Sequence, residues 1–251
     1  MKNWINRILS RMGFAIISKK KLRYHSIDEL KKMHQFDDLD MSYVKGKLGM
    51  GLKEKLISEG KTRWLDIGCG GNFENDFFYL DNFPEDTIKD RQKYFRVDIV
   101  NMNDDEADRI GKFDLVRLQH VFEHFTPEEG IRVLGNCAKL LNPDGYILIS
   151  TPDLKKYVHM YLSGKIKENF PWALTRIEKN SPDSFYFSVF AHSVLHEQHK
   201  WCYDIEGLIY QMNATGKFKN ITELRITDEL AASPFTHNRP HEDVCVLAQL
   251  K

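Results

Sequence analysis

The sequence predicts an α/β fold: a doubly wound, mostly parallel seven-stranded sheet with an antiparallel hairpin at one edge. Three observations lead to this prediction. From Thr62 onward, short apolar runs alternate with helical patterns, which is typical of βαβ units. The first of these runs leads directly into a glycine-rich turn. The last two runs are separated by a loop without helical periodicity, so we expect them to pair as antiparallel neighbours.

The composition is that of an ordinary globular protein and excludes several classes. The 251 residues are 42% hydrophobic and 29% charged, unlike disordered, collagen-like or coiled-coil chains. The 36 Lys and Arg balance the 36 Asp and Glu, so no chain-wide positive charge favours nucleic acid. The four cysteines lack zinc-site spacing, and no apolar run approaches the roughly 18 residues of a spanning helix. We therefore expect a cytoplasmic protein with reduced thiols that does not bind nucleic acid.

The N-terminal segment carries a distinct charge. Residues 1–25 contain seven basic residues and no acidic residue. Apolar residues at helical spacing between Trp4 and Met12 predict a short amphipathic helix. The favoured interpretation is packing against the rest of the protein or across a dimer. The alternative is weak peripheral contact of residues 1–23 with a partner or with anionic lipid at the inner face of the membrane.

Helical patterns continue to residue 60 and precede the sheet. A helix is expected near 49–59, closed by Gly60. We therefore divide the chain into an N-terminal helical extension, 1–60, and an α/β domain, 61–251. The expected strands of that domain are 63–67, 77–80, 94–97, 113–118, 146–150, 218–226 and 243–250.

One long connection interrupts the alternation of strands and helices. Residues 153–203 lie between a strand and the helical pattern 204–212, and they contain many aromatic residues and four of the ten histidines. A connection of this length inside a compact domain is usually a lid or a binding insertion. We therefore expect these residues to form a helical lid or binding insertion at the functional site.

The strongest local signal is the glycine-rich turn after the first strand, in the run WLDIGCGG at 64–71. Gly68 and Gly70 leave the backbone free to approach a ligand at the carboxyl edge of the sheet. A dinucleotide fingerprint would need a third glycine, where Phe73 stands, and Asp66 lies inside the strand before the first glycine. The turn thus indicates a cofactor other than a nicotinamide dinucleotide.

These motifs resemble those of the class I S-adenosylmethionine-dependent methyltransferases. LDIGCGG at 65–71 resembles their first motif, FDLV and HVFEH within 113–124 resemble their fourth strand and its trailing EH, and residues 140–152 resemble their fifth strand. The resemblance implies a Rossmann-like methyltransferase fold with a reversed seventh strand. It also implies S-adenosyl-L-methionine as the cofactor and methyl transfer as the activity.

A narrower resemblance is to predicted methyltransferases found among polysaccharide and surface-glycan biosynthesis genes. It is carried by HVFEH at 120–124, STPDL at 150–154, HKWCYD at 199–204 and EDVCV at 242–246. The sequence departs from this pattern at Asp144, where glycine is usual, and at an inserted Lys217. The resemblance implies O-methylation of a sugar or sugar-linked metabolite in capsule or lipopolysaccharide biosynthesis. The alternatives are another small or lipid-linked acceptor, or a cofactor-binding partner protein without catalysis.

The chemistry of the cofactor suggests roles for residues at the strand ends. We expect Asp81 to accept hydrogen bonds from the ribose hydroxyls and Asp98 to accept one from the adenine amino group. In an alternative register, Asp98 binds the ribose and Asp81 lies in a surface turn. Asp66 should orient the turn or reach the amino acid moiety through water, and Gln119 should border the sulfonium. The full predicted cofactor site is Asp66, Gly68, Cys69, Gly70, Asp81, Asp98 and Gln119.

Histidines beyond the fourth strand are the candidate catalytic residues. A sugar hydroxyl is a poor nucleophile at neutral pH, and a positioned base adds about 10²- to 10⁴-fold to the rate. His124 and His120 stand where the methyl group should emerge. For His124 a second interpretation is open, namely that it caps a helix started by TPEE at 126–129.

Three further histidines fall in the insertion. His192, His196 and His199 have the spacing i, i+4, i+7, which would align them on one face of a helix. We expect this face to contact the acceptor. A metal site is the alternative, but no HExxH pattern accompanies the histidines, so no metal is predicted.

Overall fold

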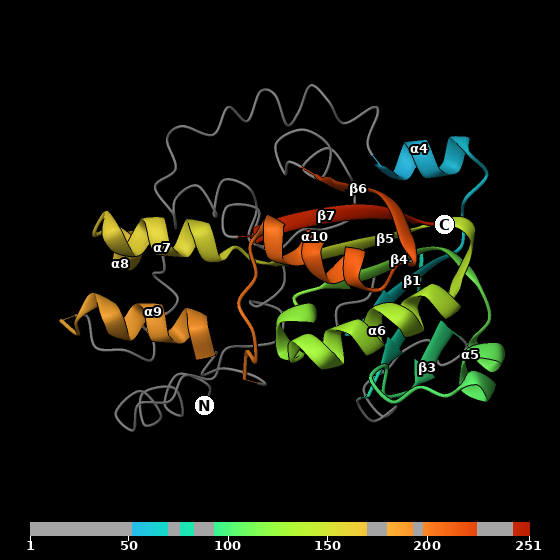
Figure 1. The fold of residues 1–251 in the computed structure, drawn as a ribbon, viewed down its shortest axis with the longest axis horizontal. Coiled ribbons are helices and arrows are strands. Elements are labelled where there is room, and N and C mark those ends of the chain that lie inside the picture. The colour runs from blue at the N-terminus through green and yellow to red at the C-terminus, as the bar shows by residue number, and fades with distance from the viewer. Residues whose placement is uncertain (1–51, 70–75, 83–92, 170–179, 193–197, 225–242) are drawn as a thin grey trace, which may run out of the picture. The chain divides into compact units, whose positions relative to one another are not determined.

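The structure is a computed structural model that describes residues 52–69, 76–82, 93–169, 180–192, 198–224 and 243–251 (Figure 1). The predicted amphipathic helix and the membrane or partner contact of residues 1–23 lie outside the described residues. So does the start of the helix expected at 49–59, whose described part is α4 (Leu52–Ser58), followed by Gly60 at φ +72°. Within the described part of the chain, no helix is long and apolar enough to cross a membrane.

Seven strands form one sheet in the order β3-β2-β1-β4-β5-β7-β6 (Figure 1). The strands are β1 (Trp64–Ile67), β2 (Phe77–Asp81), β3 (Tyr94–Arg96), β4 (Phe113–Gln119), β5 (Leu141–Pro152), β6 (Phe218–Glu223) and β7 (Asp243–Leu250). The first five are parallel, while β7 runs antiparallel to both β5 and β6. The predicted fold class, including its antiparallel edge pair, is confirmed.

The fifth strand begins earlier than predicted. Residues 142–145 read NPDG, which is a turn signal, so the sequence predicted a start at Tyr146. In the structure Leu141 already pairs with Phe113, and a register irregularity follows before Tyr146 pairs with Leu115. Asp144 lies within this irregularity at φ +57°, a conformation that favours glycine.

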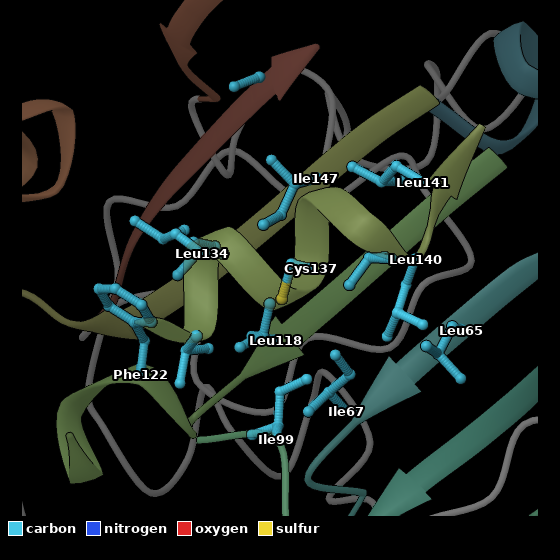
Figure 2. Close-up of a cluster of buried hydrophobic side chains, with 14 of the residues drawn as sticks. Leu65, Ile67, Ile99, Leu118, Phe122, Leu134, Cys137, Leu140, Leu141 and Ile147 are labelled. Carbon is cyan, nitrogen blue, oxygen red and sulfur yellow. The ribbon is translucent and has the colours of Figure 1, made fainter. Parts of the chain in front are cut away.

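Helices cover both faces of the sheet. The first face carries α5 (Asp104–Ile110), α6 (Pro127–Lys139) and α10 (Ile205–Ala214), whose buried residues share one apolar cluster with the strands. Figure 2 shows this cluster, in which Leu134 and Cys137 of α6 lie by Leu118 of β4. The opposite face packs against α4 through Leu52 and Leu56. Burial on both faces explains why the parallel strands read as continuous apolar runs.

Two of these helices begin with reciprocal side-chain caps. Thr126 accepts a hydrogen bond from the backbone of Glu129, whose carboxylate accepts one from the Thr126 backbone, and Asn103 and Glu106 do the same for α5. Such a capping box satisfies two backbone donors that the first helical turn leaves open. Thr126 is therefore the cap of α6. The interpretation of His124 as the helix cap is wrong.

The described part of the insertion contains three helices, in agreement with the predicted helical insertion. It contains α7 (Leu154–Leu162), α8 (Ile166–Asn169) and α9 (Asp183–His192). A small apolar cluster joins the three helices, and within it Tyr157 stacks on Phe190 with ring centroids 3.7 Å apart. Because α7 follows directly after β5, the insertion begins at the carboxyl edge of the parallel strands.

Candidate active site at the carboxyl edge of the sheet

The glycine turn begins where β1 ends. Gly68 has φ +72°, and its backbone N–H donates to the carbonyl of Leu80 at 2.8 Å. A Cβ atom on Gly68 would lie 2.3 Å from Cγ2 of Val121, in the loop after β4. Only glycine fits this position, and its bare backbone suits close approach of a ligand. Gly70, the second predicted glycine, lies outside the described residues.

The neighbouring strand brings a buried carboxylate to the same turn. Asp81 is the last residue of β2, and its Oδ2 atom lies 3.7 Å from the Cys69 thiol, which donates to it. The other oxygen accepts from the backbone of Asn82 at 2.7 Å. A buried carboxylate held beside Gly68 and Cys69 is a suitable acceptor for ribose hydroxyls, so these residues fit the predicted cofactor.

The other predicted strand-end residues have different surroundings. Asp98 is exposed, and its carboxylate accepts from the backbone of Val100 at 2.9 Å and from the Asn101 amide at 2.7 Å. It therefore stabilises the turn after β3. Gln119 ends β4, paired with Ser150 of β5, and is half-buried at the carboxyl edge.

Asp66 has a partner that sequence reasoning missed. Its two carboxylate oxygens accept hydrogen bonds from Nε and Nη2 of Arg117, both at 2.9 Å, and both side chains are buried. The guanidinium also lies over the Phe77 ring, 4.2 Å from its centroid. A single arginine inside an apolar strand belongs to no motif, so only the register of β1 against β4 could have revealed the pair.

His120 lies between two buried carboxylates. It has φ +54°, and its Nε2 atom is 2.7 Å from Oδ2 of Asp243, which is fully buried at the start of β7. Its Nδ1 atom is 3.3 Å from Oε1 of Glu123. Each contact is an ion pair when the His120 ring is protonated. Sequence reasoning gave neither carboxylate a role, although both lie in the quoted motifs HVFEH and EDVCV.

A pair of histidines, His124 and His199, lies next to Glu123. His124 ends a short 3-10 helix, η3 (Phe122–His124), and its ring meets that of His199 edge-on at a centroid distance of 5.1 Å. The residues after His199 are hydrogen-bonded to η3: the backbone N–H groups of Lys200 and Trp201 both donate to the Glu123 carbonyl. Burial lowers the pKa of His199, since desolvation disfavours the charged imidazolium.

The predicted alignment of three histidines on one helix is wrong. The helix α9 ends at His192, which is exposed, and residues 198–200 are not helical. His199 instead turns back toward the helix, with its Nδ1 atom 2.7 Å from the Phe190 carbonyl. His196 lies outside the described residues. The structure thus brings His199 to His124 and leaves His192 at a helix end.

Comparisons with known proteins agree with this geometry. A family model described as methyltransferase domain matches residues 19–216, which is most of the chain. The solved plantazolicin methyltransferase BpumL, in complex with a triazolic analogue and S-adenosylhomocysteine, is similar in fold. Its TM-score is 0.50 at 11% identity, over 90% of this chain and 92% of that one. A search of curated proteins finds no significant match.

Two further solved structures have lower TM-scores. An S-adenosylmethionine-dependent methyltransferase from Clostridium acetobutylicum has a TM-score of 0.47 at 13% identity, covering 89% of this chain and 97% of that one. The N-methyltransferase NodS from Bradyrhizobium japonicum, in complex with S-adenosylhomocysteine, has a TM-score of 0.42 at 12% identity with the same coverage.

From the family match, the sheet order and the glycine turn, we conclude that the chain belongs to the methyltransferase-domain family and is a class I S-adenosylmethionine-dependent methyltransferase.

Proposed function

We propose that the chain methylates an oxygen atom of a small acceptor, and that the acceptor is a sugar or sugar-linked metabolite of surface-glycan biosynthesis. The observation that carries the proposal is the contact between Gly68 and Val121. It joins the cofactor turn to the loop that holds His120, Glu123 and His124. A methyl donor on the turn and an acceptor beside the histidines would therefore be neighbours.

The reaction is an in-line displacement, and the protein contributes mainly alignment and exclusion of water. S-adenosylmethionine supplies a methyl group that is activated by its bond to a positively charged sulfur. The acceptor oxygen forms a bond to the methyl carbon while the carbon–sulfur bond breaks and leaves its electron pair on sulfur, giving S-adenosylhomocysteine. The proton of the acceptor hydroxyl passes to water or to a nearby base.

The sugar acceptor is supported by the motifs of the narrower resemblance. HVFEH contains His120, Glu123 and His124, HKWCYD begins with His199, and EDVCV contains Asp243. These motifs lie far apart in the sequence, yet the side chains they supply meet in one cluster at the predicted acceptor side. The proposal includes His192 and His196 as acceptor contacts, on the basis of their position in the insertion.

A labelled-methyl assay tests the acceptor class. The full-length chain is incubated with S-adenosylmethionine and a panel of nucleotide sugars, free oligosaccharides, lipid-linked sugars and unrelated hydroxylated metabolites. We expect label in a sugar, at an oxygen that mass-spectrometric fragmentation locates. Label only in a metabolite without a sugar would contradict the acceptor class and leave the methyltransferase assignment intact.

Replacing Asp81 with alanine should weaken cofactor binding. Because the buried carboxylate is expected to accept ribose hydroxyl groups, its loss should cost about 1.5–3 kcal/mol of binding free energy, the usual size for a charge-assisted hydrogen bond. Calorimetric titration with S-adenosylhomocysteine measures this. Asp98→Ala should cost less, since that carboxylate is exposed and is bonded to Val100 and Asn101. A costly Asp98→Ala beside a neutral Asp81→Ala would favour the alternative register.

A further inference from the structure

We propose that Glu123, His124 and His199 bind a divalent transition-metal ion, for which Zn²⁺ is the best chemical match. Each residue offers one ligand atom, and these three atoms lie within 4.8 Å of one another. Two imidazoles and one carboxylate form the donor set of zinc sites that keep one position open. Tetrahedral zinc with bonds of about 2.0–2.2 Å needs donors about 3.4 Å apart, so modest side-chain rotation would close the site.

The two histidines are oriented as metal ligands usually are. Nδ1 of His199 lies 2.7 Å from the carbonyl of Phe190, and Nδ1 of His124 lies 3.3 Å from the carbonyl of Gln198. A backbone carbonyl can only accept, so each Nδ1 must carry the proton. The lone pair then resides on Nε2, which is left free to bind a metal. A carbonyl that fixes the tautomer in this way is the common second partner of a metal-binding imidazole.

The carboxylate of Glu123 provides an independent observation. Glu123 is 2% exposed, and neither of its oxygens accepts a hydrogen bond from a residue that the structure describes. Among the described residues, the one ion-pair contact of Glu123 joins its Oε1 atom to Nδ1 of His120 at 3.3 Å. A buried carboxylate is strongly unfavourable unless hydrogen bonds or a cation compensate its charge. A bound metal ion would supply that compensation.

The location suggests what the ion would do. Glu123 and His124 follow Val121, which packs against the cofactor turn at Gly68. An ion with three protein donors keeps a fourth position, where a hydroxyl can bind and release its proton to water more easily. This part of the inference rests on the proposed function, because it assigns the open position to the acceptor oxygen. The metal-binding part does not.

Metal binding can be measured without any acceptor. The full-length chain is stripped with a chelator and dialysed against Zn²⁺, and one ion per chain is expected. Replacing Zn²⁺ with Co²⁺ should produce the visible absorption of a tetrahedral cobalt site. Failure of the unaltered chain to bind either ion above a trace would overturn the proposal, and this result depends on no variant.

Variants then locate the ion. Glu123→Gln and His199→Gln should each lower Zn²⁺ affinity by about 100-fold or more and remove the cobalt absorption, since each removes a direct ligand. The control is His159→Gln, an exposed histidine of α7 outside the cluster, which should bind as the parent does. Unchanged affinity in both ligand variants would place the ion elsewhere and contradict the proposal. His199→Cys, which keeps a ligand atom, should retain binding and so separates ligand loss from misfolding.

Binding of S-adenosylhomocysteine separates this inference from the proposed function. The ligand variants should keep that binding, because their side chains lie outside the cofactor turn. A chain that binds S-adenosylhomocysteine but no metal would contradict the metal site alone. A chain that binds Zn²⁺ at these residues but neither S-adenosylhomocysteine nor any acceptor would contradict the function alone.

Discussion

Gly68→Ala is expected to reduce cofactor affinity by about 10²-fold, a loss of about 2.7 kcal/mol, because the backbone expected to meet the ligand must move. The added Cβ would lie 2.3 Å from Val121, so the turn or the loop after β4 must move. In addition, an L-residue at φ +72° costs about 1–2 kcal/mol of folding free energy. Calorimetric titration with S-adenosylhomocysteine and urea unfolding measure the two effects separately.

Two comparison variants make the result specific to the turn. Gly135→Ala adds a methyl group in α6 with no atom within 4 Å, so it should stabilise the fold by about 0.5–1 kcal/mol and leave binding unchanged. Combining Gly68→Ala with Val121→Ala removes the clash but keeps the backbone strain, so part of the affinity should return. Full affinity in the single Gly68→Ala variant would show that the turn does not approach the ligand as argued.

Arg117→Met is expected to lower the free energy of unfolding by about 3–5 kcal/mol, the usual cost of breaking a buried ion pair. Methionine keeps much of the volume over Phe77 but removes both hydrogen bonds to Asp66. The remaining carboxylate is 4% exposed and loses its cationic neighbour. Urea unfolding followed by circular dichroism measures the loss.

A matched control and a double variant identify the cause. Lys139→Met breaks the exposed contact with Asp104, and its effect should be much smaller because solvent screens that pair. Adding Asp66→Leu to Arg117→Met also removes the buried carboxylate that has lost its arginine, so the double variant should be more stable than Arg117→Met alone. If the double variant loses as much as the two single changes summed, the two side chains are not coupled and the explanation fails.

The sheet could be predicted because each strand carries its own signal. Burial on both faces makes β1, β2 and β4 continuous apolar runs, and the glycine turn marks the end of the first. The start of β5 was missed because NPDG reads locally as a turn, whereas pairing with β4 keeps it in the sheet. Here tertiary pairing overrides local propensity.

The acceptor side was predictable only in part, because its contacts depend on tertiary structure. His120 and His124 could be proposed from their place after β4. Asp243, which contacts His120, could not, because it is a single charged residue at the start of an apolar strand. His199 was placed on a helix because its spacing from His192 fits one, yet spacing alone does not show that the helix continues. The order of the strands in the sheet decides which residues meet at this edge. Local sequence patterns predict each strand but do not specify which strands are neighbours.

The position of β7 between β5 and the edge strand β6 has a consequence for folding. Its residues pair with β5 on one side and β6 on the other, so β5 has an unpaired edge until β7 docks. An open edge of this kind is a template for association with another chain. Docking also requires contacts between residues far apart in sequence, which slows folding. Asp243 begins β7 and contacts His120, so a molecule in which β7 has not docked would lack this contact as well. In a refolding experiment, closure of the sheet and completion of the histidine cluster should therefore occur in the same kinetic phase.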